Sequence, residues 1–227
     1  MSTQDAILAL QDVYTDYTTS QLRTIVDLDI KGTFDHVNHA AVLLGLRAIR
    51  PGQKLYIYVK NFLTDSTVAV EVNEVQARTR YPQRGVLQGS ILSPTLFSLA
   101  LNGLTQNLRS VPGLHFTVYA DDITLWAKKG SPSDIQYTLQ SAIDTTARYL
   151  DDRGLPLSSA KSEYIVVTNS KHPNTQDRQL VTLSIKNEPT PRKPCIKVLG
   201  FWLQDDGKSK EWLRHTTQQL QQVHRLL

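Results

Sequence analysis

Two adjacent aspartates, Asp121 and Asp122, sit inside a run of strand-forming residues, and they most constrain how this chain can fold. Residues 116–119 (FTVY) lead into the pair and residues 123–126 (ITLW) lead out, which predicts a β-hairpin with the carboxylates at its tip. Charged side chains are seldom placed at the mouth of a buried sheet for packing alone. The competing interpretation is a plain turn, because Asp readily caps its own loop.

A second apolar segment also ends in acidic residues. Residues 23–29 (RTIVDLD) have the character of a strand, and Asp27 and Asp29 lie on the same face of it because side chains alternate along a strand. Two strand ends that bring carboxylates side by side would form a divalent metal site. Since successive side chains point to opposite faces, we expect Asp121 to hold metal and Asp122 to assist.

Five segments, in order along most of the chain, resemble the motifs of reverse transcriptases encoded by non-LTR retrotransposons. Residues 29–35 are similar to the first motif, 84–94 to the second, 119–122 to the third, 157–161 to the fourth and 198–201 to the fifth. Any one of these motifs is a weak signal. Five of them in the family's order and at domain-scale spacing are specific.

The resemblance implies an α+β fold, the palm of a right-hand polymerase, with a mainly antiparallel sheet, helices packed on one face, partial fingers and the start of a thumb. We expect residues 1–203 to form the palm with partial fingers, including a hairpin at about 64–82, and residues 204–227 to form the helical start of a thumb. Local hydrophobic periodicity predicts helices over residues 4–18, 36–46, 93–108, 133–154 and 212–227, and strands over 164–168, 181–185 and 196–203.

The reaction that the resemblance implies is transfer of deoxynucleotides to a primer 3′-hydroxyl with two Mg²⁺ ions, or Mn²⁺ in their place. The resemblance assigns the metal to Asp29, Asp121 and Asp122. Asp29 and Asp121 would be the pair that bridges the two ions. Lys161 is expected near the triphosphate, as a proton donor or as a counter-charge. Asp27 is a reserve candidate for the metal, and Asp35 is expected to cap the helix that begins near residue 36.

The resemblance also implies a substrate-binding set in the first two motifs. Phe34 would lie beneath the sugar of the incoming nucleotide and exclude a 2′-hydroxyl, although an isolated Phe is by default ordinary core. Arg84 would contact phosphate or template, and Gln88 and Ser90 would offer hydrogen bonds. Gly89 would let the backbone approach a template base pair. The alternative interpretation is that this glycine only permits a turn.

The fifth motif implies a site for the primer. Residues 199–202 (LGFW) resemble the hairpin that holds the primer end, with Gly200 allowing close backbone approach. Leu199 and Phe201 flank that glycine and complete the expected primer grip.

Composition agrees with this interpretation without proving it. The chain has 227 residues and 40% hydrophobic content, enough to bury one sizeable core, and its net charge of +4 only slightly favours a polyanionic partner. The single cysteine, Cys195, excludes an internal disulfide and fits a reducing compartment. No stretch approaches the roughly 18 apolar residues that span a bilayer. We therefore expect a soluble, intracellular protein, in nucleus or cytoplasm, that is not secreted.

Only residues 1–28 precede the first motif, which we expect to be too few for complete fingers. The expected partners are an RNA template, a DNA primer, deoxynucleoside triphosphates and the missing fingers, thumb and endonuclease parts of a parent polyprotein, with no membrane. The isolated chain is therefore expected to polymerise poorly. The main alternative is a catalytically incomplete or domesticated palm that binds nucleic acid or protein. An RNA-dependent RNA polymerase and a non-polymerase Mg²⁺ hydrolase fit less well.

Overall fold

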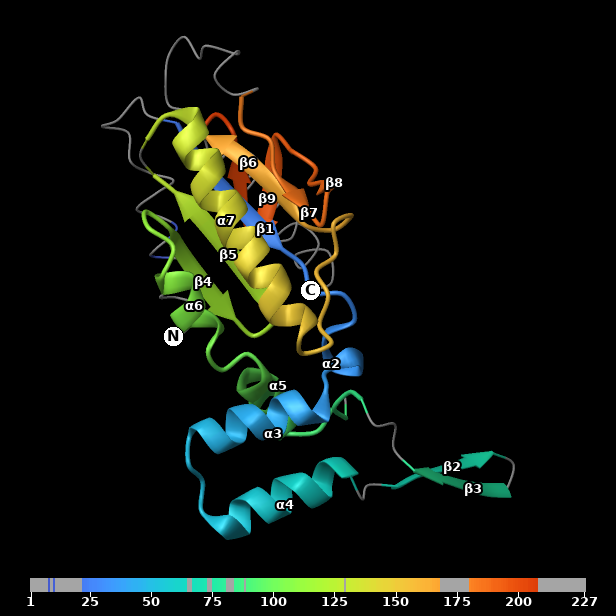
Figure 1. Ribbon diagram of the computed structural model, residues 1–227. Helices are drawn as coiled ribbons and strands as arrows, with labels where there is room; N and C mark the ends of the chain where they lie inside the picture. The colour runs from blue at the N-terminus through green and yellow to red at the C-terminus, as the bar shows by residue number, and fades with distance from the viewer. Residues whose placement is uncertain are drawn as a thin grey trace. The chain divides into compact units, whose positions relative to one another are not determined.

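The computed structural model describes Leu8, Leu10 and residues 22–64, 67–72, 75–80, 84–87, 89–128, 130–167 and 180–207 (Figure 1). The chain divides into two compact units. The first comprises residues 1–29, 107–147 and 157–227, and the second comprises residues 30–106 and 148–156. Within the described ranges, no helix is both long and apolar enough to cross a membrane.

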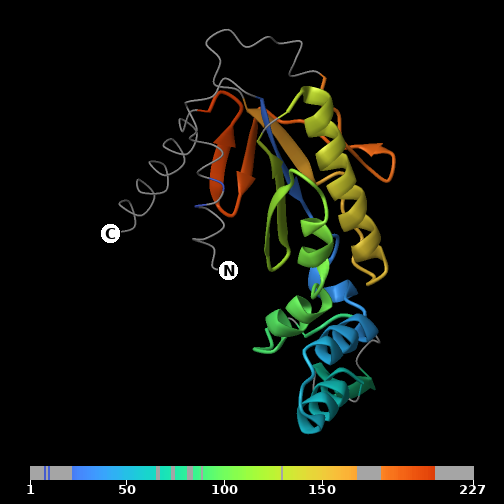
Figure 2. The ribbon, with the colours of Figure 1, turned by 60° about the vertical axis from the view of Figure 1, so that its left-hand side comes forward.

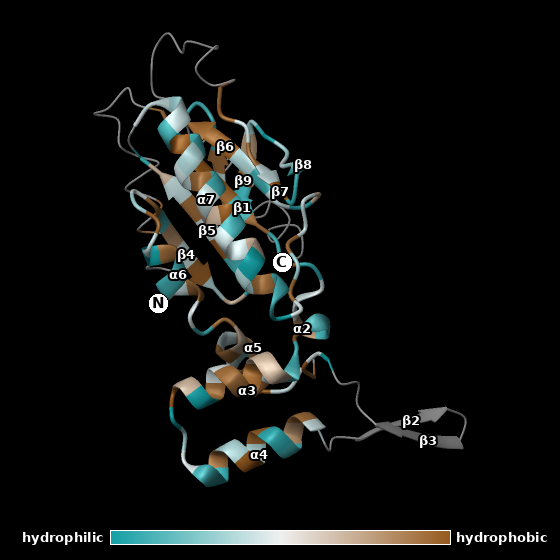
Figure 3. Cartoon of the chain, in the orientation of Figure 1, coloured by the Kyte–Doolittle hydropathy of each residue, from teal (hydrophilic) through white to brown (hydrophobic). Residues whose placement is uncertain are grey.

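The first unit is built on a four-stranded antiparallel sheet in the order β4-β5-β1-β6. Its strands are β1 (Arg23–Leu28), β4 (His115–Tyr119), β5 (Asp122–Ala127) and β6 (Glu163–Val167). Strand β1 pairs with both β5 and β6, so that Val26 lies opposite Leu125 on one side and Tyr164 on the other. Most of the strand residues are apolar (Figure 3), as residues of a central sheet are expected to be.

Helix α7 (Pro132–Asp151) covers one face of this sheet (Figures 1 and 2). Ile135, Leu139 and Ile143 recur at helical spacing, and none of the three is exposed to solvent. The helix begins with a reciprocal cap: the Ser131 N–H donates to the Asp134 carboxylate, and the Asp134 N–H donates to the Ser131 hydroxyl. The helix therefore starts slightly earlier than the predicted residue 133.

The opposite face of the sheet is covered by a β-hairpin, formed by β9 (Cys195–Val198) and β10 (Phe201–Gln204). Three buried sheet residues, Ile25, Trp126 and Ile165, form one apolar cluster with hairpin residues that include Ile196 and Leu203. The strand predicted over 196–203 is two strands, because the chain turns at Leu199 and Gly200, within the hairpin that the fifth motif predicted over 199–202. The strand predicted over 181–185 is reduced to β7 (Ser184–Ile185), which pairs with β8 (Glu188–Pro189).

The second unit contains the helices that follow the first and second motifs, and a hairpin. These are α2 (Thr33–His36), α3 (His39–Ala48), α4 (Gln53–Thr64), α5 (Ser93–Ala100), β2 (Thr67–Val72) and β3 (Val75–Arg80). Helices α3 and α5 pack so closely that a Cβ added at Gly45 would come 1.8 Å from the Leu99 carbonyl oxygen. Only glycine fits at that crossing.

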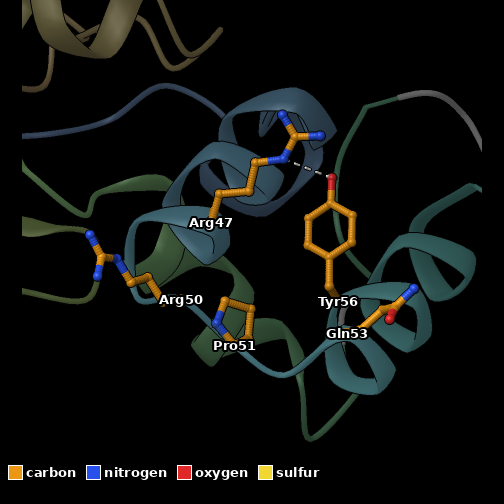
Figure 4. A pocket seen from close by; sticks show the side chains of 5 residues that line it. All are labelled: Arg47, Arg50, Pro51, Gln53 and Tyr56. Atoms are coloured by element: carbon orange, nitrogen blue, oxygen red, sulfur yellow. Dashed lines mark hydrogen bonds between the residues drawn. The ribbon is translucent and has the colours of Figure 1, made fainter.

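The turn between α3 and α4 is held by side chains rather than by an extensive core. The Arg47 Nε donates to the Tyr56 hydroxyl at 3.1 Å, and its guanidinium lies 5.3 Å from the centre of the Tyr56 ring (Figure 4). Both residues line an open cavity of about 310 Å³ together with Arg50, Pro51 and Gln53. A cation over an aromatic ring adds a modest attraction at such an exposed site.

Several predicted helices are interrupted. The predicted helix over 36–46 is divided between α2 and α3 by Val37 and Asn38, and the Asn38 side chain caps α3 by accepting from the Ala40 N–H at 2.9 Å. The capping role expected of Asp35 was wrong, because Asp35 lies inside α2, whose first residue follows Gly32.

The helix predicted over 93–108 is likewise two helices, α5 and α6 (Leu104–Arg109). Gly103, between them, has a φ of 104°, which lies in the left-handed region and cannot continue an α-helix. The Ser93 hydroxyl does not cap α5 but donates to the Leu87 carbonyl. The predicted helix over 212–227 and most of that over 4–18 lie outside the described residues.

Candidate active site

Asp29 of the first motif lies with Asp121 and Asp122 of the third at one end of the four-stranded sheet. Strand β1 ends at Leu28, which pairs with Ile123 of β5, so the next residues along the two strands are Asp29 and Asp122. Alternation along β1 places Asp29 on the same face as Asp27. This is the face of the β9–β10 hairpin, not the face of α7.

Asp121 stands in the tight turn of the β4–β5 hairpin. Tyr119 pairs with Asp122, which leaves only Ala120 and Asp121 in the turn. Ala120 has a φ of 51°, in the left-handed region that residues other than glycine rarely occupy. Strained backbone of this kind persists where the surrounding structure imposes it, and it often occurs at functional sites.

The three carboxylates of the predicted metal set lie within electrostatic reach of one another. Burial raises the pKa of Asp29, the nearby Lys161 ammonium pulls it down, and the charge of Asp121 raises it further. Burial also raises the pKa of Asp122, and Asp121 and Asp29 add to that effect. Negative charges held together in a partly desolvated place favour either a proton or a cation.

Asp27 lies one strand period behind Asp29 on the same face. Burial raises its pKa to about 7, with a further contribution from the charge of Asp122. The Thr124 hydroxyl, directly across the sheet, donates to Asp27 Oδ1 at 3.3 Å. Asp27 therefore remains the reserve acidic group, set deeper than Asp29.

The residues present fit a divalent cation. The buried Asp29 Oδ2 has no hydrogen-bond partner among the described residues, and a buried carboxylate oxygen needs a donor or a cation. Among the described residues, no group of three or more His, Cys, Asp or Glu side chains is placed so that it could hold a metal ion by itself. Some divalent cations are held by only one or two carboxylates together with substrate phosphates and water.

The fourth motif holds the backbone of Asp29 in place. The Asp29 N–H donates to the Ser162 hydroxyl at 3.0 Å, and the Ser158 N–H donates to the Asp29 carbonyl at 2.8 Å. The sequence did not point to Ser162, because a serine beside a motif lysine carries no distinguishing spacing. Lys161, which the sequence did single out, is exposed next to it.

In the second unit, several of the predicted substrate-binding residues come together. Phe34, Gly89 and Ser90 line one cavity of about 380 Å³, together with Ile91, Ser93 and Pro94. The first two motifs are joined by main-chain hydrogen bonds, one of them from the Val86 N–H to the Phe34 carbonyl at 2.7 Å. The Phe34 ring lies 5.4 Å from that of Phe97.

The remaining predicted residues are placed as follows. Arg84 is exposed and bridges to Asn38 through the main chain, and Gln88 lies outside the described residues. Leu199 and Gly200 form the two-residue turn of the β9–β10 hairpin, with φ values of 49° and 89°, as a type I′ turn requires. Phe201 is partly exposed at the start of β10.

Comparison with known proteins places this geometry in a family. Residues 2–203 match the family described as reverse transcriptase (RNA-dependent DNA polymerase). The chain belongs to the reverse transcriptase family. Members of the family generally use divalent metal ions, which agrees with an Asp29 oxygen that finds no hydrogen-bond partner among the described residues.

The relatives of this reverse transcriptase chain come from non-LTR elements, as the five motifs predicted. It is 31% identical over 173 residues to a Pol polyprotein from a type-1 R2 retrotransposable element of Popillia japonica, covering 71% of this chain and 24% of the relative. It is 27% identical over 146 residues to the RNA-directed DNA polymerase from mobile element jockey of Drosophila melanogaster, covering 63% of this chain and 16% of the relative. The chain thus spans about a quarter or less of each of these two proteins.

The solved structures that resemble this reverse transcriptase chain include telomerases. Apo telomerase from Candida tropicalis, truncated from its C-terminal domain, superposes with a TM-score of 0.61 at 14% identity, over 90% of this chain and 38% of that one. An identity this low is evidence for the fold alone. The superposition confirms the predicted α+β fold of a polymerase palm.

Proposed function

We propose that this chain carries the nucleotidyl-transfer centre of an RNA-directed DNA polymerase, which adds deoxynucleotides to a primer 3′-hydroxyl. One observation carries the proposal: Asp29, beside Asp121 and Asp122 at the end of the sheet, has a buried carboxylate oxygen with no hydrogen-bond partner in the described part of the chain. A carboxylate in that state is ready to bind a cation.

The residues of this centre have separate tasks. Asp29 and Asp121 would hold two Mg²⁺ ions between them, and Asp122 would assist. Bound ions would lower the pKa of the primer hydroxyl and neutralise charge on the triphosphate. Lys161, whose charge already acts on Asp29, would add a positive charge beside the departing pyrophosphate.

The proposed substrates are an RNA template, a DNA primer and deoxynucleoside triphosphates. The name of the jockey relative, an RNA-directed DNA polymerase, supports an RNA template. Phe34, with Gly89 and Ser90 around one cavity, supports a deoxynucleotide, because a bulky ring leaves little room for a 2′-hydroxyl. Leu199, Gly200 and Phe201 would hold the primer.

The test is extension of a DNA primer on an RNA template by the purified chain with deoxynucleotides and Mg²⁺. Since the isolated chain is expected to polymerise poorly, we expect weak extension by the unchanged chain and by Asp152→Asn, which neutralises an exposed carboxylate, and none by Asp121→Ala. Extension that persists undiminished in Asp121→Ala would refute the proposal. Retained binding of primer and template without extension by any variant would favour the alternative, a palm that acts as a nucleic-acid binding module.

A further inference from the structure

Asp29 lies just beyond the hydrogen-bonded ladder of the sheet. The last described pair between β1 and β6 joins Asp27 to Glu163, so the main chain of Asp29 has no strand partner on the β6 side. A metal ligand placed past the end of a strand needs another means of being held.

The short segment before β6 supplies that means through two residues. The hydroxyl of Ser162 accepts the Asp29 N–H at 3.0 Å, while the N–H of Ser158 donates to the Asp29 carbonyl at 2.8 Å. The two serines are themselves joined, because the Ser162 N–H donates to the Ser158 carbonyl at 2.9 Å. Both main-chain polar groups of Asp29 are therefore fixed by one turn of chain.

Ser162 is the side-chain member of this arrangement, and its position makes it rigid. It is fully buried, so its hydroxyl has a single environment and no competing water. It also directly follows Lys161, whose charge lowers the pKa of Asp29. The same turn thus bonds the backbone of Asp29 and carries the Lys161 ammonium that acts on its carboxylate.

We propose that Ser162 is a positioning residue of the catalytic centre: its hydroxyl holds the backbone of Asp29 so that the carboxylate is directed at the metal. The inference rests on the proposed function, since it takes Asp29 as a metal ligand. Groups that orient a ligand from behind typically change metal affinity by about 10- to 100-fold when they are lost. A hydroxyl that only satisfied an N–H would change stability and leave metal affinity as it was.

The experiment measures Mn²⁺ binding to the whole chain by electron paramagnetic resonance, beside the melting temperature. We expect Ser162→Ala to weaken Mn²⁺ binding about 10-fold and Ser162→Thr, which restores the hydroxyl, to recover most of the affinity. The matched control is Thr146→Val, which removes another fully buried hydroxyl that bonds a main-chain carbonyl, that of Ala142. Its Mn²⁺ affinity should equal that of the unchanged chain.

The outcomes separate the two proposals. If the unchanged chain binds Mn²⁺ and Asp29→Asn weakens that binding, but Ser162→Ala binds as tightly as the unchanged chain, the role of Ser162 is overturned and the metal centre stands. If the unchanged chain binds no Mn²⁺, both are overturned. Should Ser162→Ala fail to fold, Ser162→Cys takes its place, because a thiol is a much weaker acceptor and should weaken binding in the same direction.

Discussion

The two faces of the four-stranded sheet are made from the same strands but carry opposite chemistry. On the face under α7, β1 contributes the buried apolar residues Val26 and Leu28, with the buried Thr24 before them and no charged residue. On the other face, the alternate positions change along the strand from the apolar Ile25 to Asp27, and Asp29 follows just past the end of the strand. Because side chains alternate strictly along a strand, β1 can anchor the core with one set of residues and present carboxylates with the other.

Stability and chemistry reside on different faces of the sheet. The face under α7 is expected to contribute stability without touching the reaction. The carboxylate face contains groups whose pKa values burial raises, which means that they are held at a cost to the folded state. Substitutions on the two faces should therefore have opposite effects.

The largest expected effect is at the carboxylate end. Asp29→Asn keeps the size of the side chain and removes its charge, so primer extension should fall by about 1,000-fold or more, since the metal loses a ligand. The melting temperature without metal should stay the same or rise, because burial and Asp121 both disfavour the charged form of Asp29. Extension assays and thermal denaturation in EDTA measure the two quantities. Retained activity, or a clear loss of stability, would contradict the assignment.

The reverse pattern is expected under α7. Leu139→Ala removes a fully buried side chain, and the free energy of unfolding should fall by roughly 2–5 kcal/mol because a cavity is left. Urea denaturation measures this. Tyr137→Ala, two residues away on the same helix and 76% exposed, is the matched control and should change stability by less than about 0.5 kcal/mol. Equal losses in both variants would show that α7 does not cover the sheet as described.

The sequence was sufficient for the parts of this sheet that depend on local pattern. The strand predicted over 23–29 is β1, and the hairpin around Asp121 is β4 and β5, because apolar runs bounded by polar residues are read directly from the chain. The motif order also identified the family. These features are encoded within a few residues of each position.

What the sequence could not supply depends on contacts between distant residues. The Ser162 hydroxyl and the Asp29 N–H are separated by 133 positions, and no local pattern reports such a bond. The breaks in the helices at Asn38 and Gly103 were missed for a similar reason. Helical periodicity continues across both breaks, and the observed caps and turns are chosen by packing with other segments.

The carboxylate face should also make stability depend on pH, because Asp27 is its deeper acid. Its pKa is raised from 3.8 to about 7 in the folded state, so the folded chain retains a proton that the unfolded chain has lost between these values. The stability of the unchanged chain should therefore fall as pH rises from about 4 to about 7, and then level off. Asp27→Asn cannot ionise and should escape this loss.

We expect Asp27→Asn to be more stable than the unchanged chain by on the order of 1–3 kcal/mol at pH 8, with the advantage shrinking toward pH 4. Thermal denaturation across this range in EDTA measures the difference, because bound metal would itself lower the pKa of Asp27. Asp152→Asn, at an exposed position, should show no such trend. An advantage that grows in acid would reverse the sign of the argument.

The smallest effect is expected at the tip of the β4–β5 hairpin. Ala120 is the first residue of its turn and has a φ of 51°, whereas the turn of the β9–β10 hairpin has Leu199 at 49° followed by a glycine, Gly200, at 89°. Glycine adopts this backbone without a steric penalty, so Ala120→Gly should raise the free energy of unfolding by up to about 1 kcal/mol, partly offset by greater freedom in the unfolded chain. The urea midpoint measures the change.

A lower midpoint would mean that the Ala120 methyl group makes a contact worth more than the strain, and that the turn beside Asp121 is held by packing. A higher midpoint, with weaker Mn²⁺ binding, would mean that the strain at Ala120 is part of how Asp121 is directed at the metal.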